Sequence, residues 1–408
     1  MRIATISYHG SPLAPPGVPS TGGMQVYVRE LSRALAAQGH QVDVFTRKSD
    51  PTEPAVVVDR PGFRVINLIA GPLAPVAKSE LPLYLCSFAR EVLRFAEAEG
   101  QSYDLIHSHY WLSGRVGRAL RSRWNVPHVT MFHTLAEVKN RARIGEREPD
   151  ERISSERLLI SDVDQIIVAS AHERLQLLRF YEAVEEQISV VPCGVDLDHF
   201  RPLPKESARA AVGARGRYVV LFVGRIEPLK GIDILIRAAA ELEERDDVEV
   251  IIAGGGSDGH RDELRRLRAL AAECGIGDQV RFIGPQPQDR LVLWYNAADI
   301  TVVPSYYESF GLVAVESMAC GTPVIASRVG GLTSTVRDGE TGYLIPWRCP
   351  EAFLERMELL LGNETLRRHF GEAARRSVER FRWSAIAEQI AAVYRAVVAP
   401  VVTRAAGR

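Results

Sequence analysis

The stretch Tyr218-Val219-Val220-Leu221-Phe222-Val223-Gly224 opens the second half of the chain with a nearly continuous apolar run. A strand that is apolar on both faces is typical of a parallel sheet covered by helices on both sides, because neither face meets water. Glycine ends the run, and Pro228 and Gly231 follow as turn residues before a new helical pattern. The stretch therefore predicts a strand, loop and helix unit of an open α/β sheet.

The same alternation of strand and helix patterns extends to both sides of this stretch. On the carboxyl side, strand patterns lie at residues 248–253, 280–283, 300–303 and 323–326. Helical patterns separate them, for example at residues 260–273 and 310–319, and another helical region covers residues 350–399. On the amino side, strand patterns lie at residues 2–7, 41–46, 104–107, 126–132, 165–169 and 188–191, with a helical pattern at 24–38. This order predicts parallel sheets with helices on both faces.

Residues 191–196 interrupt the alternation with the sequence Val-Pro-Cys-Gly-Val-Asp. Pro192 and Gly194 are turn formers, so we interpret the segment as a hinge between two domains, residues 1–194 and 195–384. A chain of 408 residues is longer than a single hydrophobic core usually supports, which agrees with two doubly wound domains. Near the end, Trp383-Ser384 marks a break in the helical pattern, with Ser384 as the expected N-cap.

Composition and charge exclude several classes of protein. With 46% hydrophobic and 25% charged residues, the chain is neither disordered nor fibrous. Its net charge of −1 disfavours a nucleic-acid partner that relies on a bulk positive field. The 5 cysteines are odd in number and form no CxxC pair, which disfavours a zinc site or a disulfide framework and indicates a reducing cytosol.

The location expected from the sequence is the cytoplasm. The first apolar stretch is too short for a signal peptide. No stretch approaches the roughly 18 apolar residues that a transmembrane helix needs, so we expect no transmembrane segment. Peripheral membrane contact and a homodimer both stay open.

The loop after the first strand argues against a nicotinamide dehydrogenase. A dinucleotide-binding fold would place GxGxxG within a few residues of that strand, whereas Gly22-Gly23 comes much later, just before the first helix. A glycine pair at a helix start lets an anion approach backbone N–H groups. A turn required only by chain geometry is the alternative.

Two cations follow the strand at residues 218–224. Arg225 and Lys230 are five residues apart and flank a proline turn, so both could reach one diphosphate. Ligands of open α/β sheets bind at the carboxyl ends of the strands, where these residues lie. A pair of solvated surface charges is the alternative interpretation.

The segment Glu308-Ser309-Phe310-Gly311-Leu312-Val313-Ala314-Val315-Glu316 combines a helix start with two carboxylates. The N–H groups of residues 309–312 would face an anion at the helix N-terminus. Glu316 lies about two turns from Glu308 on an otherwise apolar helix, so its carboxylate needs a hydrogen-bonding partner such as a ribose. An exposed acidic helix face is the alternative.

These motifs together resemble the retaining glycosyltransferases of family 4. The resemblance rests on ESFGLVAVE at 308–316, the following MACGTPVIA at 318–326, VGRIEPLKG at 223–231 and the glycine turns at 329–331 and 338–342. It covers almost the whole chain and is strongest, at residues 1–47 and 104–140, to the branch that glycosylates inositol phosphate in the mycothiol pathway; sucrose-phosphate synthases share the motifs. The resemblance implies the GT-B fold: two Rossmann-like domains around the active site, with a final helix, here 385–408, returning to the first domain.

The resemblance also implies a donor site for a UDP-sugar, either UDP-N-acetylglucosamine or UDP-glucose. Catalytic roles fall on Glu308, His133, Arg225 and Lys230. The resemblance assigns donor binding to Gly23, Arg225, Lys230, Gln286, Glu308, Phe310, Gly311, Leu312 and Glu316. Arg225 and Lys230 would neutralise the diphosphate, Glu316 would accept hydrogen bonds from the ribose, and Gln286 would meet the uracil through its backbone.

The acceptor site implied by the resemblance takes a small phosphorylated polyol such as inositol phosphate. It consists of Lys78, Tyr110, Thr134 and Arg152. Two cations and two hydroxyls suit a phosphate dianion. A packing aromatic at a strand end is the alternative for Tyr110, and a surface lysine is the alternative for Lys78.

Other functions stay open at this stage. The acceptor could be a sugar phosphate, as for a sucrose-phosphate synthase, and the same fold could serve a nucleotide-sugar epimerase or a non-catalytic sensor. We expect no required cofactor and no metal site; magnesium is not implied and stays open. His107 and His109 lie on one face of a strand, where core or cleft positions are more common than metal ligation.

Overall fold

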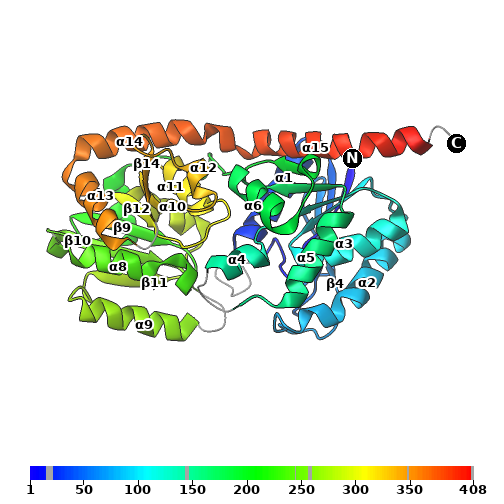
Figure 1. Cartoon of the computed structure of the whole chain (residues 1–408), viewed down its shortest axis with the longest axis horizontal. Coiled ribbons are helices and arrows are strands. Elements are labelled where there is room, and N and C mark those ends of the chain that lie inside the picture. Colours follow the sequence, from blue (N-terminus) through cyan, green and yellow to red (C-terminus); the bar gives the residue numbers. More distant parts are fainter. Residues whose placement is uncertain (15–21, 143–146, 244, 256–259, 347–348, 406–408) are drawn as a thin grey trace.

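The computed structural model describes residues 1–14, 22–142, 147–243, 245–255, 260–346 and 349–405. Two α/β units lie side by side, each with a central sheet between helices (Figure 1). Among the described residues, no helix is both long and apolar enough to cross a bilayer. The two sheets, each between helices, form the expected pair of doubly wound domains.

The first unit contains an eight-stranded sheet with the order β3-β4-β2-β1-β5-β6-β7-β8. The strands are β1 (Arg2–Ile6), β2 (Gln41–Arg47), β3 (Val56–Arg60), β4 (Phe63–Leu68), β5 (Leu105–His109), β6 (His128–Met131), β7 (Gln165–Val168) and β8 (Ile188–Val190). Its helices are α1 (Gly23–Ala37), α2 (Leu85–Ala98), α3 (Trp111–Trp124), α4 (Ala136–Ala142), α5 (Asp150–Asp162) and α6 (Ala171–Tyr181).

The second unit contains a six-stranded parallel sheet with the order β11-β10-β9-β12-β13-β14. The strands are β9 (Tyr218–Val223), β10 (Val248–Ala253), β11 (Val280–Gly284), β12 (Ile300–Val303), β13 (Val324–Ser327) and β14 (Gly342–Ile345). The helices are α7 (Lys205–Val212), α8 (Ile232–Ala240), α9 (His260–Glu273), α10 (Gln288–Ala297), α11 (Leu312–Ala319), α12 (Leu332–Thr335), α13 (Pro350–Gly362) and α14 (Glu364–Ser377).

The last helix, α15 (Trp383–Ala405), ties the two units together. It continues the line of α14 and crosses over to pack on α1 of the first unit (Figure 1). The hydroxyl of Tyr394 on this helix lies 2.6 Å from Nδ1 of His107 on β5. The carboxyl-terminal helix thus returns to the first sheet, as the GT-B resemblance implies.

Two expected helix starts are wrong. The helix expected to begin at Phe310 begins at Leu312, because Gly311 has a φ of 90° and cannot continue a right-handed helix backwards. The break expected at Trp383-Ser384 lies one residue earlier, since Trp383 is the first residue of α15. Ser384 is therefore in the first turn and not at the N-cap; its carbonyl accepts a hydrogen bond from Nε2 of Gln38, at 2.8 Å.

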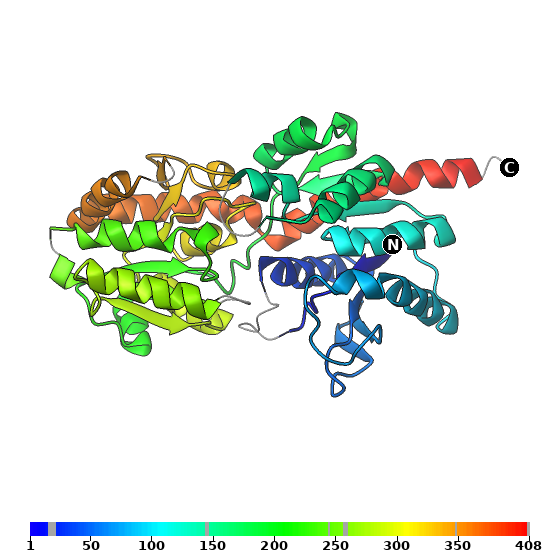
Figure 2. The ribbon, with the colours of Figure 1, turned by 60° about the horizontal axis from the view of Figure 1, so that its bottom comes forward.

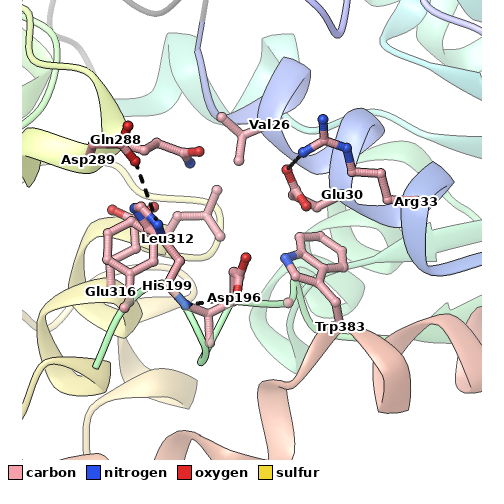
Figure 3. Close-up of a pocket in the computed structure, with 13 residues that line it drawn as sticks. Val26, Glu30, Arg33, Asp196, His199, Gln288, Asp289, Leu312, Glu316 and Trp383 are labelled. Atoms are coloured by element: carbon pink, nitrogen blue, oxygen red, sulfur yellow. Dashed lines mark hydrogen bonds and ion pairs between the residues drawn. The ribbon is translucent and has the colours of Figure 1, made fainter. Parts of the chain in front are cut away.

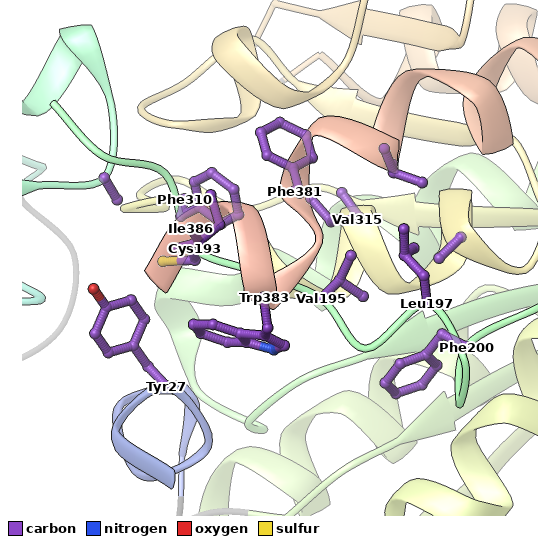
Figure 4. Packing of buried hydrophobic residues seen from close by; sticks show 14 of the residues in the cluster. Tyr27, Cys193, Val195, Leu197, Phe200, Phe310, Val315, Phe381, Trp383 and Ile386 are labelled. Atoms are coloured by element: carbon purple, nitrogen blue, oxygen red, sulfur yellow. The ribbon is translucent and has the colours of Figure 1, made fainter. Parts of the chain in front are cut away.

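One apolar cluster runs through the hinge and joins both units (Figure 4). Tyr27 of α1 and Trp383 of α15 pack edge to face, with ring centroids 5.5 Å apart. Gly194 touches the indole so closely that a Cβ would lie 2.3 Å from Cδ2 of Trp383. The two chain crossings, at residues 191–196 and at Trp383, therefore pack against each other.

The order of strands brings the loops of both sheets to one cleft. In the first sheet, β1 pairs with β2 on one side and β5 on the other; in the second, β9 pairs with β10 and β12. Ligands of open α/β sheets bind where the strand order reverses in this way, beyond the carboxyl ends. The loops after these strands carry most of the residues singled out above, and they face each other between the two units (Figure 2).

Candidate active site

Two residues at the carboxyl ends of neighbouring strands have a left-handed backbone. Tyr110 follows β5 with a φ of 77°, and His133 follows β6 with a φ of 61°. Such conformations are unfavourable for residues other than glycine and concentrate at functional sites. The N–H of Tyr110 donates to the carbonyl of Met131 at 2.9 Å, which fixes the two loops to each other. The two left-handed residues are thereby held next to each other beyond the carboxyl ends of β5 and β6.

His133 connects the first unit to the second. Its Nε2 lies 3.0 Å from Nδ1 of His109, and its carbonyl accepts a 2.6 Å hydrogen bond from Oγ of Ser309. Burial lowers the pKa of His133 to about 3, with a further contribution from His9. The imidazole is therefore neutral at physiological pH, and it is suited to hydrogen bonding rather than to charge stabilisation.

The two predicted donor cations each have a carboxylate partner. Nζ of Lys230 donates to Oε2 of Glu308 at 2.7 Å, and both side chains are more than four-fifths buried. Arg225 is more exposed and pairs with Glu227 at 2.9 Å. Lys230 and Glu308 come from loops after different strands, β9 and β12, so the structure brings together two residues that are 78 positions apart.

The start of α11 is held by a glycine turn that follows β13. The N–H of Gly331 donates to the carbonyl of Glu308 at 2.9 Å. At Gly330 a Cβ would lie 1.8 Å from the same carbonyl oxygen, so no larger residue fits. Beyond this contact, Phe310 is buried, and Gly311 is the N-cap of the helix. The first N–H groups of α11, including that of Leu312, have no helical acceptors and form an anion-binding end.

Glu316 lies on α11 beside a cavity of about 170 Å³ between the two units (Figure 3). Burial raises its pKa to about 7, although Tyr295 donates a 2.8 Å hydrogen bond to Oε2. Val26 and Glu30 of α1 line the opposite wall. A carboxylate in such a wall suits hydroxyl donors of a polar ligand.

Other predicted donor residues frame the same region. A Cβ on Gly23 would lie 3.3 Å from Cδ1 of Leu312, so the start of α1 faces the start of α11 across the cleft. Nearby, Nη2 of Arg29 donates to Oε1 of Gln288 at 2.7 Å. The side chain of Gln286 turns back and donates to the carbonyl of Ile283 at 2.9 Å.

Three of the four predicted acceptor residues, Tyr110, Thr134 and Arg152, contact one another on the first unit, whereas Lys78 is an exposed residue of the same unit. Arg152 is 2% exposed, and its Nη2 donates to the carbonyl and to Oγ1 of Thr134 at 2.8 and 3.0 Å. Its guanidinium carbon lies 4.7 Å from the ring centroid of Tyr110. Partial desolvation lowers the pKa of Lys78, and the positive charge of Arg225 lowers it further. The charge of Lys78 is therefore felt within the same region as that of Arg225.

Several residues of the site were missed by the sequence reasoning. His9 packs against Tyr110 with ring centroids 4.8 Å apart, and burial lowers its pKa to about 4, helped by Lys78. Ser309 and His109 hold His133, as described above. Only the position of His9 after β1 could have revealed it. A histidine that contacts another loop has no local pattern that distinguishes it from a core residue.

Metal ligation finds no support within the described ranges, which contain no group of three or more His, Cys, Asp or Glu side chains arranged to hold an ion. His107 and His109 stack with centroids 4.1 Å apart and are wholly buried. Burial lowers the pKa of both rings. All 5 cysteines are unpaired.

The chain matches two family models that together cover most of its length. Residues 21–199 match the model described as Glycosyltransferase Family 4, and residues 204–377 match Glycosyl transferases group 1. The two matches divide the chain near the hinge at residues 191–196.

Curated relatives and a solved structure resemble the chain over nearly its full length. The D-inositol 3-phosphate glycosyltransferase of Corynebacterium jeikeium is 45% identical, over 97% of this chain and 96% of that protein. The enzyme of the same name from Acidothermus cellulolyticus is 47% identical, over 97% and 90%. The structure of sucrose-phosphate synthase from Thermosynechococcus elongatus superposes with a TM-score of 0.90 at 39% identity, over 98% of this chain and 99% of that one.

Proposed function

The chain belongs to glycosyltransferase family 4 and is a glycosyltransferase with the GT-B fold, and from that premise we propose a substrate pair. The donor is a UDP-sugar, UDP-N-acetylglucosamine or UDP-glucose. The acceptor is a small phosphorylated polyol such as inositol phosphate. Transfer retains the configuration of the anomeric carbon.

The observation that carries this proposal is the contact of Arg152 with both Thr134 and Tyr110 on the first unit. Arg152 is fixed by Thr134 and lies over the ring of Tyr110, at the distances given above. The guanidinium is a planar forked donor of the kind that phosphate takes, and a phosphate would compete for it with its present carboxylate partner Glu148. The curated relatives, named for inositol 3-phosphate, support the same acceptor class.

The donor assignment rests on the second unit. Lys230 and Arg225 supply positive charge after β9, and the start of α11 supplies free N–H groups, so a diphosphate between them would be stabilised from both sides. Glu316, lining the adjacent cavity, would accept hydrogen bonds from the ribose. His133 is neutral and would line the sugar position.

In the reaction that we propose, the bond between the anomeric carbon and the diphosphate oxygen breaks, and a bond to the acceptor hydroxyl oxygen forms on the same face. The acceptor proton moves to the leaving diphosphate, so the products are UDP and the glycosylated phosphate. Glu308 is engaged by Lys230 at 2.7 Å, which suits a role in orienting the sugar rather than attacking it. Lys230, Arg225 and the helix start stabilise the charge that develops on the diphosphate. The scheme uses no metal.

A second acceptor class is favoured by the sucrose-phosphate synthase structure, which is 39% identical to this chain. A sugar phosphate such as fructose 6-phosphate presents the same phosphate group to Arg152. The site on the second unit would be unchanged, so only the part of the acceptor beyond the phosphate separates the two possibilities.

The test is UDP release by the purified protein. UDP-N-acetylglucosamine and UDP-glucose are each combined with inositol phosphate, fructose 6-phosphate and the unphosphorylated forms of both. We expect turnover only with a phosphorylated acceptor, and the fastest pair identifies the substrates. Equal turnover with unphosphorylated acceptors would refute the acceptor assignment. Tight UDP binding without acceptor-dependent release would point to a sensor. Conversion of a UDP-sugar into its epimer would indicate an epimerase.

A further inference from the structure

The carboxylate of Glu148 bridges two cations beside the acceptor residues. Its Oε2 pairs with Nη1 of Arg152 at 2.9 Å, and its Oε1 pairs with Nζ of Lys139 on α4. Nη2 of Arg152 donates to Thr134 and Nε pairs with Glu156, so all three guanidinium nitrogens have partners. A phosphate that approaches the outer face of the guanidinium meets this carboxylate first.

The two carboxylates on Arg152 differ in their surroundings. Glu156 is wholly buried, pairs with Nε of Arg152 at 2.7 Å and accepts from the N–H of Ala136 at 3.0 Å and from Tyr181. It is a structural anchor of α5. Glu148 retains 17% of its side-chain exposure and lies in the loop before α5. Of the two, Glu148 is the one that can leave the guanidinium.

Glu148 is held in place mainly by charge. Burial alone would raise its pKa, but Arg152 and Lys139 outweigh burial and hold the pKa below its ordinary value, so the group is an anion. Its backbone is fixed separately, because its N–H donates to Oδ1 of Asn140 at 2.7 Å. The side chain can therefore rotate away while the loop remains anchored by Asn140.

Lys78 completes the electrostatic picture. The charge of Lys139 lowers the pKa of Lys78, and that of Glu148 raises it, so both lie within interaction range of this acceptor residue. Lys139 and Arg152 thus hold the carboxylate of Glu148 directly, and Lys78 is an exposed cation nearby. Two cations that share one monovalent carboxylate are suited to an anion of higher charge, such as a phosphate dianion.

We propose that Glu148 occupies the acceptor-phosphate position when no acceptor is bound, and that Lys139 is a further phosphate ligand. This inference rests on the proposed function of the same site. A phosphate dianion takes over the contacts to Arg152 and Lys139 and displaces the carboxylate, because two anions cannot share the position without repulsion. An unphosphorylated acceptor does not displace Glu148, so the displacement selects for the phosphate.

The test is calorimetric titration of the full chain with inorganic phosphate, in the presence of saturating UDP so that the donor site is occupied. We expect E148Q to bind phosphate about tenfold or more tightly, because the competing charge is gone. We expect K139M to bind it about tenfold or more weakly, with the affinity for UDP unchanged. The same order should hold for the KM of inositol phosphate.

The matched control is E137Q, a substitution on α4, the short helix that also carries Lys139. Glu137 pairs with Arg141 at 2.9 Å and loses the same charge, but it has no contact with Arg152. Its phosphate affinity should equal that of the wild type. If E148Q is unstable in a melting experiment, E148A replaces it, and the same tightening is expected from the loss of the carboxylate.

Weaker or unchanged phosphate binding in the Glu148 variants would overturn the displacement, and unchanged binding in K139M would remove Lys139 from the site. These outcomes differ from a failure of the proposed function. If the wild type transfers sugar to no phosphorylated acceptor, yet phosphate affinity follows the expected order, the anion site stands and the transferase substrates are wrong. If transfer occurs but the order does not, only the inference about Glu148 and Lys139 fails.

Discussion

Glu316 shows how the environment of one side chain prepares it for a ligand. Its carboxyl group lies on an apolar helix, and burial raises its pKa to about 7. Within the part of the chain that the structure describes, its carboxyl group accepts a hydrogen bond from Tyr295. Because ribose hydroxyls donate to an ionised carboxylate, a bound nucleotide would favour ionisation and lower the pKa again.

The first prediction is that E316Q binds UDP about 10- to 100-fold more weakly than the wild type, since charged hydrogen bonds contribute about 1.5–3 kcal/mol. The wild-type advantage should grow as the pH rises towards 7 and then level off, because only the ionised group is a full acceptor. Titration calorimetry between pH 5.5 and 8.5 measures the ratio of the two affinities, from which the titration of UDP itself cancels. With 2′-deoxy-UDP the ratio should shrink; an equal ratio for both nucleotides would separate Glu316 from the ribose.

A second buried carboxyl gives a prediction about stability. Glu173 on α6 is 3% exposed, and burial raises its pKa to about 7, while its Oε2 accepts from the N–H of Ala169 at 2.9 Å. The folded state therefore binds a proton that the unfolded state releases near pH 4.5. The stabilisation is complete below that pH and is lost as the pH rises through about 7.

The second prediction compares E173Q with the wild type by urea unfolding at pH 5 and pH 8. The wild type should lose about 2.5 kcal/mol relative to E173Q between these values, because the unfolded state releases the proton of Glu173 near pH 4.5 and the folded state only near pH 7. Histidines titrate in both proteins, so the difference isolates Glu173. A difference that does not change with pH would mean that Glu173 is ionised in the fold at both values.

At this scale, the sequence singled out candidate residues of the site but not how they pair. The spacing of Arg225 and Lys230 indicated one anion site, yet the partner of Lys230 is Glu308, on a loop after a different strand. The left-handed backbones of Tyr110 and His133 have no sequence signal either. Both result from contacts between adjacent strands, which a local pattern does not contain.

Among the elements, most inner strands and the edge strands β8 and β11 were predicted, whereas β3, β4 and β14 were not. The strand patterns at 2–7 and 41–46 correspond to β1 and β2, because both strands are almost fully buried, β1 with a mainly apolar run and β2 with alternating apolar residues. The hairpin of β3 and β4 was missed, and β3 runs antiparallel to its neighbour. Residues of β3 alternate between exposed and intermediate burial, so no apolar run marks it. The edge strand β14 was likewise absent from the prediction.

Among the described residues, one side-chain hydrogen bond joins the helix α15 to the sheet that it crosses. The hydroxyl of Tyr394 and Nδ1 of His107 form a 2.6 Å hydrogen bond, and both side chains are buried. The other ring nitrogen of His107, Nε2, has no hydrogen-bond partner among the described residues. The hydroxyl of Tyr394 is therefore the hydrogen-bond partner of Nδ1 of His107.

The third prediction is that Y394F lowers the free energy of unfolding by about 1–3 kcal/mol, because it leaves a buried nitrogen without a partner. Urea unfolding with circular dichroism measures the loss. Y343F, a tyrosine of the second sheet that is only partly buried, is the control and should stay within about 0.5 kcal/mol of the wild type. A loss equal to that of the control would mean that the ring packing of Tyr394, and not its hydroxyl, attaches α15.

For the whole molecule, a small set of polar contacts holds the two units face to face. Ser309 donates to the carbonyl of His133 at 2.6 Å, and Arg29 donates to Gln288 at 2.7 Å. The second contact lies close to the cavity that Glu316 lines, which also includes Gln288. Both contacts lie near the apolar hinge, because Gln288 lines the same cavity as Gly194 and Trp383, and the ring of His133 packs against Tyr27 of the hinge cluster. They therefore add polar contacts between the units to the apolar ones of the hinge.

The fourth prediction concerns the closed arrangement. R29A and Q288A each remove the contact between α1 and α10 without altering either core, so both should widen the ligand-free molecule in solution. Small-angle X-ray scattering measures the radius of gyration, and UDP should restore the compact form if the cleft binds the diphosphate from both sides. Closure also excludes water from a reactive donor. The variants should therefore hydrolyse more UDP-sugar per transfer than the wild type.

R33A is the control, because Arg33 on the same helix pairs with Glu30 and Asp59 within the first unit. The double variant should be no more open than either single variant, since both disrupt the same hydrogen bond; additive effects would show that Arg29 and Gln288 act on closure separately.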